Sequence, residues 1–121
     1  MTVIDSSGWI EFFADGPQAG VFATVLKDPS KIVTPTIVIY EVFKKLKRDI
    51  GEQVAELCLG LMRKTTVVAL DENLTLLAVE LSLEHSLAMA DSIVLATAQA
   101  HAAELVTKDP DFPQIPGVRL V

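Results

Sequence analysis

Short apolar runs alternate along the chain with longer segments of helical period, and this alternation limits the possible folds more than any other feature. Apolar runs of strand length occur at residues 2–4, 32–33, 65–70, 105–107 and 118–121. Repeated strand–helix units of this kind are typical of a mainly parallel sheet covered by helices. The pattern therefore predicts an α/β fold around a central, mainly parallel sheet.

The segments between these runs have the apolar periodicity of helices. Two short helices are expected at 8–13 and 17–26, separated by the turn sequence at 15–17. Further helices are expected from residue 36 to about 49, at 52–64, after Asp71 and at 89–103, the last of which is apolar on nearly every side. The core-facing stripes of the helices at 36–49 and 52–64 are expected at Ile39, Val42, Phe43, Leu46 and Ile50, and at Val54, Leu57, Cys58 and Leu61.

Composition narrows the class of protein. The 121 residues, half of them hydrophobic, suit one folded domain. A net charge of −6 argues against binding nucleic acid or an anionic membrane by overall charge, so such contacts need a local basic patch. One cysteine and two histidines exclude an internal disulfide and a structural zinc site. The first apolar run contains Asp5 and follows no basic segment, so we expect neither a signal peptide nor a membrane span, and a cytoplasmic location.

Two aspartates directly follow predicted strands. Asp5 follows the run at 2–4, and Asp109 follows the run at 105–107, with Asp111 close behind. The carboxyl ends of parallel strands are where α/β sheets place ligand sites. Ordinary structural roles also remain open, because aspartate is a preferred N-cap of a following helix and Asp-Pro is a common turn.

Two further acids stand in apolar helical surroundings. Asp91 interrupts the apolar run 87–96, where an ionised carboxylate is costly unless something pairs with it, although it would also cap a helix that begins at the next residue. Glu41 follows the apolar residues 37–40. Taken alone, an exposed i,i+4 pair with Lys45 is the simpler interpretation of this glutamate.

These acids are expected to converge. The carboxyl ends of strands and the amino ends of helices lie on the same side of a parallel sheet, and three of the acids occupy such positions. Carboxylates brought together raise one another's pKa unless a cation offsets their charge. Oxygen ligands without histidine or cysteine select Mg²⁺ or Mn²⁺. We therefore predict a metal site formed by Asp5, Glu41, Asp91 and Asp109.

Four blocks of sequence carry a resemblance to a known family. They are VIDSSGWI at 3–10, PTIVIYEV at 35–42, MADSIVLATA at 89–98 and LVTKDPDF at 105–112. In this order and at these separations they resemble the PIN-domain ribonucleases and, within them, the short bacterial and archaeal VapC-like toxins of toxin–antitoxin pairs. The resemblance covers the whole chain.

The resemblance implies a compact three-layer α/β/α fold, Mg²⁺- or Mn²⁺-dependent cleavage of RNA that leaves a 5′-phosphate, a homodimer, and an antitoxin that covers the site. It implies metal contacts for Asp5, Asp91 and Asp109, and a ligand or water-positioning role for Glu41. The polar residues expected to support these acids are Ser6 and Thr107, with Asp111 as an extra acid.

Two other classes of protein remain open. A phosphoacceptor receiver domain has a similar length and would use Asp5 with Lys108. That class needs an adjacent acidic pair after the first strand, whereas Asp5 is followed by two serines. The second alternative is a catalytically idle PIN scaffold that only binds RNA or a partner.

A cluster of bases follows Glu41. On a helix, Lys44, Lys45 and Arg48 lie within about 60° of the direction of Glu41, whereas Lys47 points away. We expect these three residues to contact RNA phosphates. The alternative is an ordinary basic helix end that suits the helix dipole.

Several apolar residues exceed what the amphipathic stripes require. Clustered on neighbouring short helices, they indicate a surface for a partner. The resemblance implies that an antitoxin segment lies there. The residues expected to face the surface are Phe12, Phe13, Val21, Phe22, Leu59 and Met62.

Overall fold

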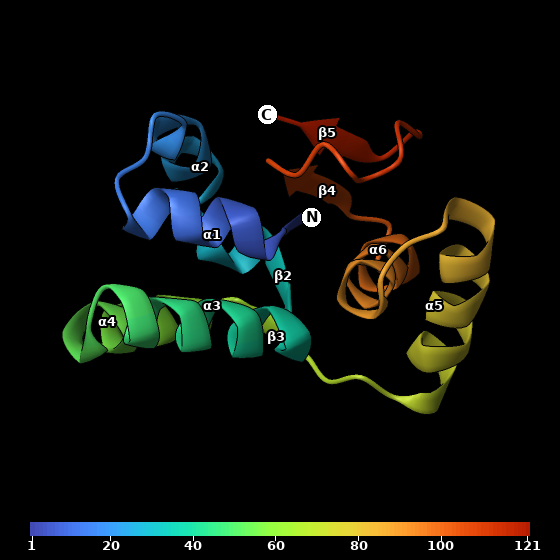
Figure 1. Ribbon diagram of the computed structural model, residues 1–121, viewed down its shortest axis with the longest axis horizontal. Helices are drawn as coiled ribbons and strands as arrows, with labels where there is room; N and C mark the ends of the chain where they lie inside the picture. Colours follow the sequence, from blue (N-terminus) through green and yellow to red (C-terminus); the bar gives the residue numbers. More distant parts are fainter.

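The computed structural model of the protein describes residues 1–121 and contains a five-stranded sheet (Figure 1). All neighbouring strands are parallel, in the order β3-β2-β1-β4-β5, which confirms the predicted α/β class. The strands are β1 (Thr2–Ile4), β2 (Ile32–Pro35), β3 (Thr66–Val68), β4 (Glu104–Thr107) and β5 (Val118–Leu120).

The helices form one layer on each side of the sheet. In Figure 1, α1 to α4 lie on one side, and α5 and α6 lie together on the other. No helix combines the length and the apolar character needed to cross a membrane. The helices are α1 (Ser6–Phe13), α2 (Ala19–Val25), α3 (Thr36–Asp49), α4 (Glu52–Met62), α5 (Glu72–His85) and α6 (Met89–Ala100), with a 3₁₀ turn, η1 (Pro29–Lys31), before β2.

The strand order explains why there are two helical layers. From β1 through β2 to β3 the chain steps toward one edge of the sheet, and it then returns past β1 to form β4. Strand–helix–strand connections between parallel strands are right-handed, so reversing the step moves the helices to the opposite face. The reversal point lies between β1 and β4, where such sheets place ligand sites.

α6 is buried on nearly every side, as its composition predicts. Residues 92–98 are all buried, and the helix contacts β1, β2 and β4. It ends earlier than the predicted residue 103, because Ala102 takes a left-handed φ of 49° and Ala103 N donates to Ala98 O. The chain then turns directly into β4.

The core stripes of α3 and α4 differ in part from the prediction. Ile50, at the end of α3, is 47% exposed, and Leu57 on α4 is 70% exposed. On α4, two faces have similar apolar spacing, so periodicity alone does not select the one that packs inward. The buried positions are Val38, Val42 and Leu46 on α3, and Ala55, Cys58 and Met62 on α4.

A close approach at Gly8 packs α2 against α1 and β1. A Cβ atom at Gly8 would lie 2.7 Å from Cγ2 of Ile4 and nearer still to the ring of Phe22. Phe22 is fully buried, so the expectation that it faces the surface is wrong. The missing side chain at Gly8 leaves room for the Phe22 ring, a contact between two helices that the pattern of either helix alone does not reveal.

Candidate active site

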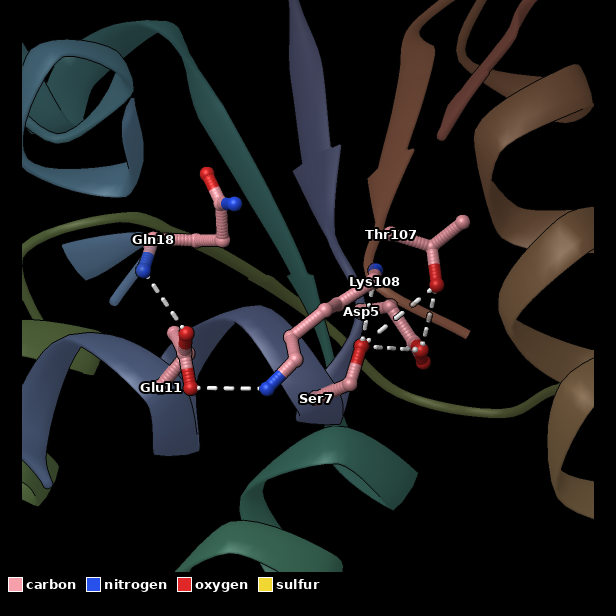
Figure 2. A network of polar contacts seen from close by, with 6 residues as sticks. All are labelled: Asp5, Ser7, Glu11, Gln18, Thr107 and Lys108. Atoms are coloured by element: carbon pink, nitrogen blue, oxygen red, sulfur yellow. Dashed lines mark hydrogen bonds and ion pairs between the residues drawn. The ribbon is translucent and has the colours of Figure 1, made fainter. Parts of the chain in front are cut away.

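Asp5 lies directly after β1 with its side chain nearly buried. The hydroxyls of Ser7 and Thr107 both donate to Asp5 Oδ2 at 2.9 Å (Figure 2). Asp5 occupies the N-cap position of α1, but its side chain makes no capping hydrogen bond. Burial raises the pKa of Asp5, and the two hydroxyl hydrogen bonds act in the opposite direction. The Asp5 carboxylate is therefore oriented by two hydroxyl groups and does not cap α1.

The same two hydroxyls also bind the loop after β4. Ser7 Oγ accepts from Lys108 N at 3.1 Å, and Thr107 Oγ1 accepts from Asp109 N at 2.9 Å. Each hydroxyl gives its one proton to Asp5 and keeps lone pairs for these amides. Thr107 and Ser7 thus each connect Asp5 to the loop after β4, and nothing in the sequence pattern singled out Ser7.

Ser6 supports a different acid. Its hydroxyl donates to Glu41 Oε1 at 2.6 Å, which joins the start of α1 to α3. The simple i,i+4 pair between Glu41 and Lys45 is not formed, because Lys45 Nζ lies 3.4 Å from Asp49 Oδ2. Glu41 is half-buried and faces α1.

Asp91 lies in the first turn of α6, a helix that begins before it and not after it. It is therefore not the N-cap of this helix. No hydrogen bond offsets the effects that raise the pKa of its carboxyl to about 6. These effects are burial, followed by the negative charges of Asp5, Asp109, Glu41 and Asp111.

Asp109 combines two roles. Its Oδ1 accepts from Asp111 N at 2.9 Å, so Asp109 does form the turn that an Asp-Pro sequence favours. Its charge also acts on Asp91. Asp111 is exposed at the edge of the group.

The five acids thus interact through their charges without forming a finished metal site. No three histidine, cysteine, aspartate or glutamate side chains stand close enough together to hold an ion in their present positions. The carboxylates that we call the acidic group are Asp5, Glu41, Asp91 and Asp109. Metal binding by this group remains a prediction.

A groove of ≈ 310 Å³ opens beside Glu41. Lys47 does not line it; its ammonium lies 3.6 Å from Glu52 Oε1 and over the ring of Phe43. The side chains expected to form a basic strip do line the groove, next to Glu41. The lining residues are Ser6, Ile10, Tyr40, Glu41, Lys44, Lys45 and Arg48.

Asp49 neutralises part of this basic strip. Arg48 Nε and Nη2 donate to its two carboxylate oxygens at 2.7 and 3.1 Å, and Lys45 lies at 3.4 Å. The hydrogen bond from Arg48 is the main reason that the pKa of Asp49 falls to about 2. Nothing in the sequence pattern assigned Asp49 a role.

The predicted partner surface is smaller than expected. Met62, like Phe22, is fully buried, so its surface position is also wrong. Val21 is 37% exposed, while Phe12, Phe13 and Leu59 are half-buried. Apolar side chains on paired short helices pack on one another, which leaves less of them exposed than each helix alone suggests. The most exposed apolar side chains around α5 and the start of α6 are Leu76, Val79, Leu83 and Met89.

Comparison with known proteins agrees with this architecture. A family model of the PIN domain matches residues 2–118. No curated protein sequence matches the chain. A chain of a toxin–antitoxin complex from Klebsiella pneumoniae superposes with a TM-score of 0.83 and 25% identity, over 98% of this chain and 96% of that one.

Two further solved structures share the fold. VapC20 from Mycobacterium tuberculosis, described as a Sarcin-Ricin loop cleaving toxin, has a TM-score of 0.75 and 17% identity over 94% of this chain and 91% of that one. DNA-bound VapBC from Salmonella typhimurium has a TM-score of 0.77 and 17% identity over 100% and 98%. These likenesses concern the fold.

The receiver-domain alternative is wrong. The family match excludes it, and Lys108, which would have to face the phosphoacceptor Asp5, donates to Glu11 Oε1 at 2.8 Å. The order of the strands, the acids at the carboxyl ends of β1 and β4, and the match over residues 2–118 lead to one conclusion. The chain belongs to the PIN domain family.

Proposed function

We propose that this protein is a metal-dependent endoribonuclease and the toxin of a toxin–antitoxin pair. Its family and the toxins among its structural relatives support this proposal. The observation that carries it is the placement of Asp5 and Asp109 after the neighbouring strands β1 and β4, close enough to Asp91 that their charges, after burial, help to raise its pKa to about 6. Carboxylates gathered without a counter-charge are typical of a site that binds a cation.

In this proposal Asp5, Asp91 and Asp109 hold Mg²⁺ or Mn²⁺, and Glu41 is a fourth ligand or positions the attacking water. The donor set suits such an ion, because every member is a carboxylate. The side chains would have to turn toward one another, and no hydrogen bond holds the Asp91 carboxylate back. When bound, the ion activates a water and offsets charge on the phosphate oxygens under attack.

The supporting residues orient the acids. Ser7 and Thr107 hold Asp5, and Ser6 holds Glu41, each through a hydroxyl that donates to the carboxylate. Such outer partners set the direction of the ligands that they contact. The protein itself supplies no nucleophile, because water attacks the phosphodiester.

The basic strip holds the substrate. Lys44, Lys45 and Arg48 bind RNA phosphates that flank the cleaved bond, in the groove beside Glu41. Asp49 must give up part of its pairing with Lys45 and Arg48 when a phosphate arrives. This local patch offsets the net charge of −6 where the polyanion binds.

The test is incubation of the purified protein with a mixed RNA pool, with Mg²⁺ or with a chelator, followed by mapping of the new 5′ ends. Cleavage that needs the metal and leaves 5′-phosphates is expected. RNA binding without cleavage would favour the idle scaffold, and the same cleavage in chelator would contradict the metal site.

We also propose a homodimer and an antitoxin segment that lies over α1, α2 and α4, at Phe12, Phe13, Val21 and Leu59, with a basic side chain approaching the acidic group. Phe13→Ser should weaken self-association or antitoxin binding, measured by light scattering and by titration with the antitoxin. Leu76→Ser, on the far side of the sheet, is the control for antitoxin binding. A monomer at micromolar concentration whose partner binding is unchanged by Phe13→Ser would contradict this placement.

A further inference from the structure

Glu11 is a buried carboxylate on α1 that the acidic group does not include. Two separate segments donate to it: Lys108 Nζ to Oε1 at 2.8 Å, and Gln18 N to Oε2 at 2.8 Å (Figure 2). Its side chain is only 7% exposed. Gly16 makes this possible, because a Cβ atom there would overlap the carboxylate of Glu11.

Lys108 is held at both ends. Its backbone N donates to Ser7 Oγ at 3.1 Å, while its ammonium reaches Glu11. The preceding residue, Thr107, donates to Asp5 Oδ2. Two successive residues at the exit of β4 are therefore tied to β1 and α1, across sequence separations of 97 to 102 residues.

An ion pair of this kind fixes geometry more than it adds stability. Water screens part of the attraction because the Lys108 side chain is 42% exposed, and the cost of burying the Glu11 carboxylate cancels more of it, so the pair is a weak source of net stability. The ammonium that pairs with the buried Glu11 carboxylate, however, comes from the loop after β4, so the contact links that loop to α1. The next residue in that loop is Asp109, whose backbone N is bound to Thr107 Oγ1 at 2.9 Å.

We propose that Glu11 is a positioning residue of the candidate active site. Through Lys108 it fixes the loop at 107–109, and so the position of the Asp109 carboxylate relative to Asp5. The catalytic consequence rests on the proposed ribonuclease function. The effect on the binding of a cation between these carboxylates is separate from it.

Three variants test the proposal: Glu11→Gln, Lys108→Met and the double variant. Glu11→Gln keeps an acceptor for Gln18 N, and Lys108→Met keeps the apolar stem. Each single change should lower kcat by about 10-fold with KM little changed, the low end of the range for groups that contact a ligand directly, and should weaken Mn²⁺ binding by a similar factor, measured from the electron paramagnetic resonance signal of free Mn²⁺. The double variant should be no worse than either single variant, because both remove the same contact.

Glu104→Gln is the matched control. It removes an ion pair between β4 and β5, with Arg119 Nε 3.5 Å from Glu104 Oε1, away from the acidic group. It should leave Mn²⁺ binding and kcat unchanged. Thermal melting establishes whether each variant folds. If Glu11→Gln does not fold, the test rests on Lys108→Met, because the Lys108 side chain is 42% exposed and its replacement disturbs the core less.

Unchanged Mn²⁺ affinity and kcat in a folded Glu11→Gln protein would overturn the proposal. Losses that multiply in the double variant would overturn it too, because Lys108 would then act independently of Glu11. If the unaltered protein binds Mn²⁺ but cuts no RNA, the proposed function fails. The Mn²⁺ affinities of the variants then still decide whether Glu11 positions the loop.

Discussion

Asp5 and Glu11 are near neighbours in the chain and are both nearly buried, at 4% and 7% exposure, yet their pKa values move in opposite directions. Burial raises the pKa of Asp5, whose hydrogen-bond partners are the uncharged hydroxyls of Ser7 and Thr107 and the backbone of Ser6. The hydrogen bond from the ammonium of Lys108 lowers the pKa of Glu11. The chain supplies a cation to one carboxylate and none to the other.

The difference shows where charge is left uncompensated in this protein. Around Asp5 the neighbouring charged groups are further acids, and burial together with these negative charges raises the pKa of Asp91 to about 6. Around Glu11 the charge is balanced within the fold. A cation from solvent is therefore expected to stabilise the acidic group, and to have little to offer at Glu11.

Of the changes considered, removal of the Asp91 charge should have the largest effect on activity. Asp91→Asn keeps the volume and polarity of the side chain but deletes the charge that a metal needs. Mg²⁺-dependent RNA cleavage should fall by more than about 100-fold. Loss of a group that only contacts a metal ligand costs up to about that factor, and Asp91 is proposed as a ligand itself. The melting temperature without metal should stay level or rise, because repulsion is relieved. Undiminished activity would show that Asp91 lies outside the active site.

Thr107→Val should have the next largest effect, because it deprives Asp5 of a donor and Asp109 N of an acceptor. Activity should fall by about 10–100-fold. The free energy of unfolding in urea should fall by about 1–3 kcal/mol. Thr97→Val, at a buried threonine that donates to Ile93 O, is the control and should keep its activity. Equal loss of activity in both variants would assign the effect to packing.

The pH dependence of stability should separate the two regions, because their pKa shifts have opposite signs. The folded pKa of Asp91, about 6, exceeds its ordinary value of 3.8, so the folded state binds the proton more tightly. The unfolding free energy of the metal-free protein should thus fall as the pH rises through this interval. The pKa of Glu11 lies below its ordinary value of 4.5. The ionised Glu11 carboxylate therefore stabilises the folded state above pH 4.5, and this stabilisation is lost as the pH falls through the folded pKa.

Urea unfolding of the metal-free protein across this pH range measures both effects. Asp91→Asn should gain stability relative to the unaltered protein as the pH rises from about 4 to about 6. Glu11→Gln should lose less stability on acidification than the unaltered protein does. Parallel pH curves for all three proteins would mean that the two carboxylates do not differ as described.

The smallest effect is expected at the basic strip. Changing Lys45 and Arg48 together to glutamine should flatten the slope of log RNA affinity against log salt by roughly one to one and a half units. The Mg²⁺ midpoint should not move. Lys47→Gln is the control and should leave the slope nearly unchanged, because the Lys47 ammonium lies near Glu52 and outside the groove. Equal sensitivity at Lys47, with an unchanged slope in the double variant, would mean that the strip is only a helix end.

Local pattern was enough to predict most of the secondary structure and the acidic group. Alternating strand and helix signals report on neighbouring residues, so they predicted the parallel sheet and the buried α6. The unusual positions of Asp5 and Asp91 pointed to a site, because a charge after a buried strand or in an apolar helix needs an explanation. The resemblance then added Thr107 and Ser6, whose hydroxyls do bind acids.

By itself, then, the sequence determined which segments form strands and helices and which carboxylates stand in apolar surroundings. Only the tertiary structure decided which apolar faces are buried: Met62 but not Leu57 on α4, and Phe22 on α2. It also decided that Lys108 pairs with Glu11. The physical reason is that periodicity describes one element at a time and leaves similar faces equivalent. Contacts such as Lys108 with Glu11, 97 residues apart, exist only because the strand order places β4 beside β1.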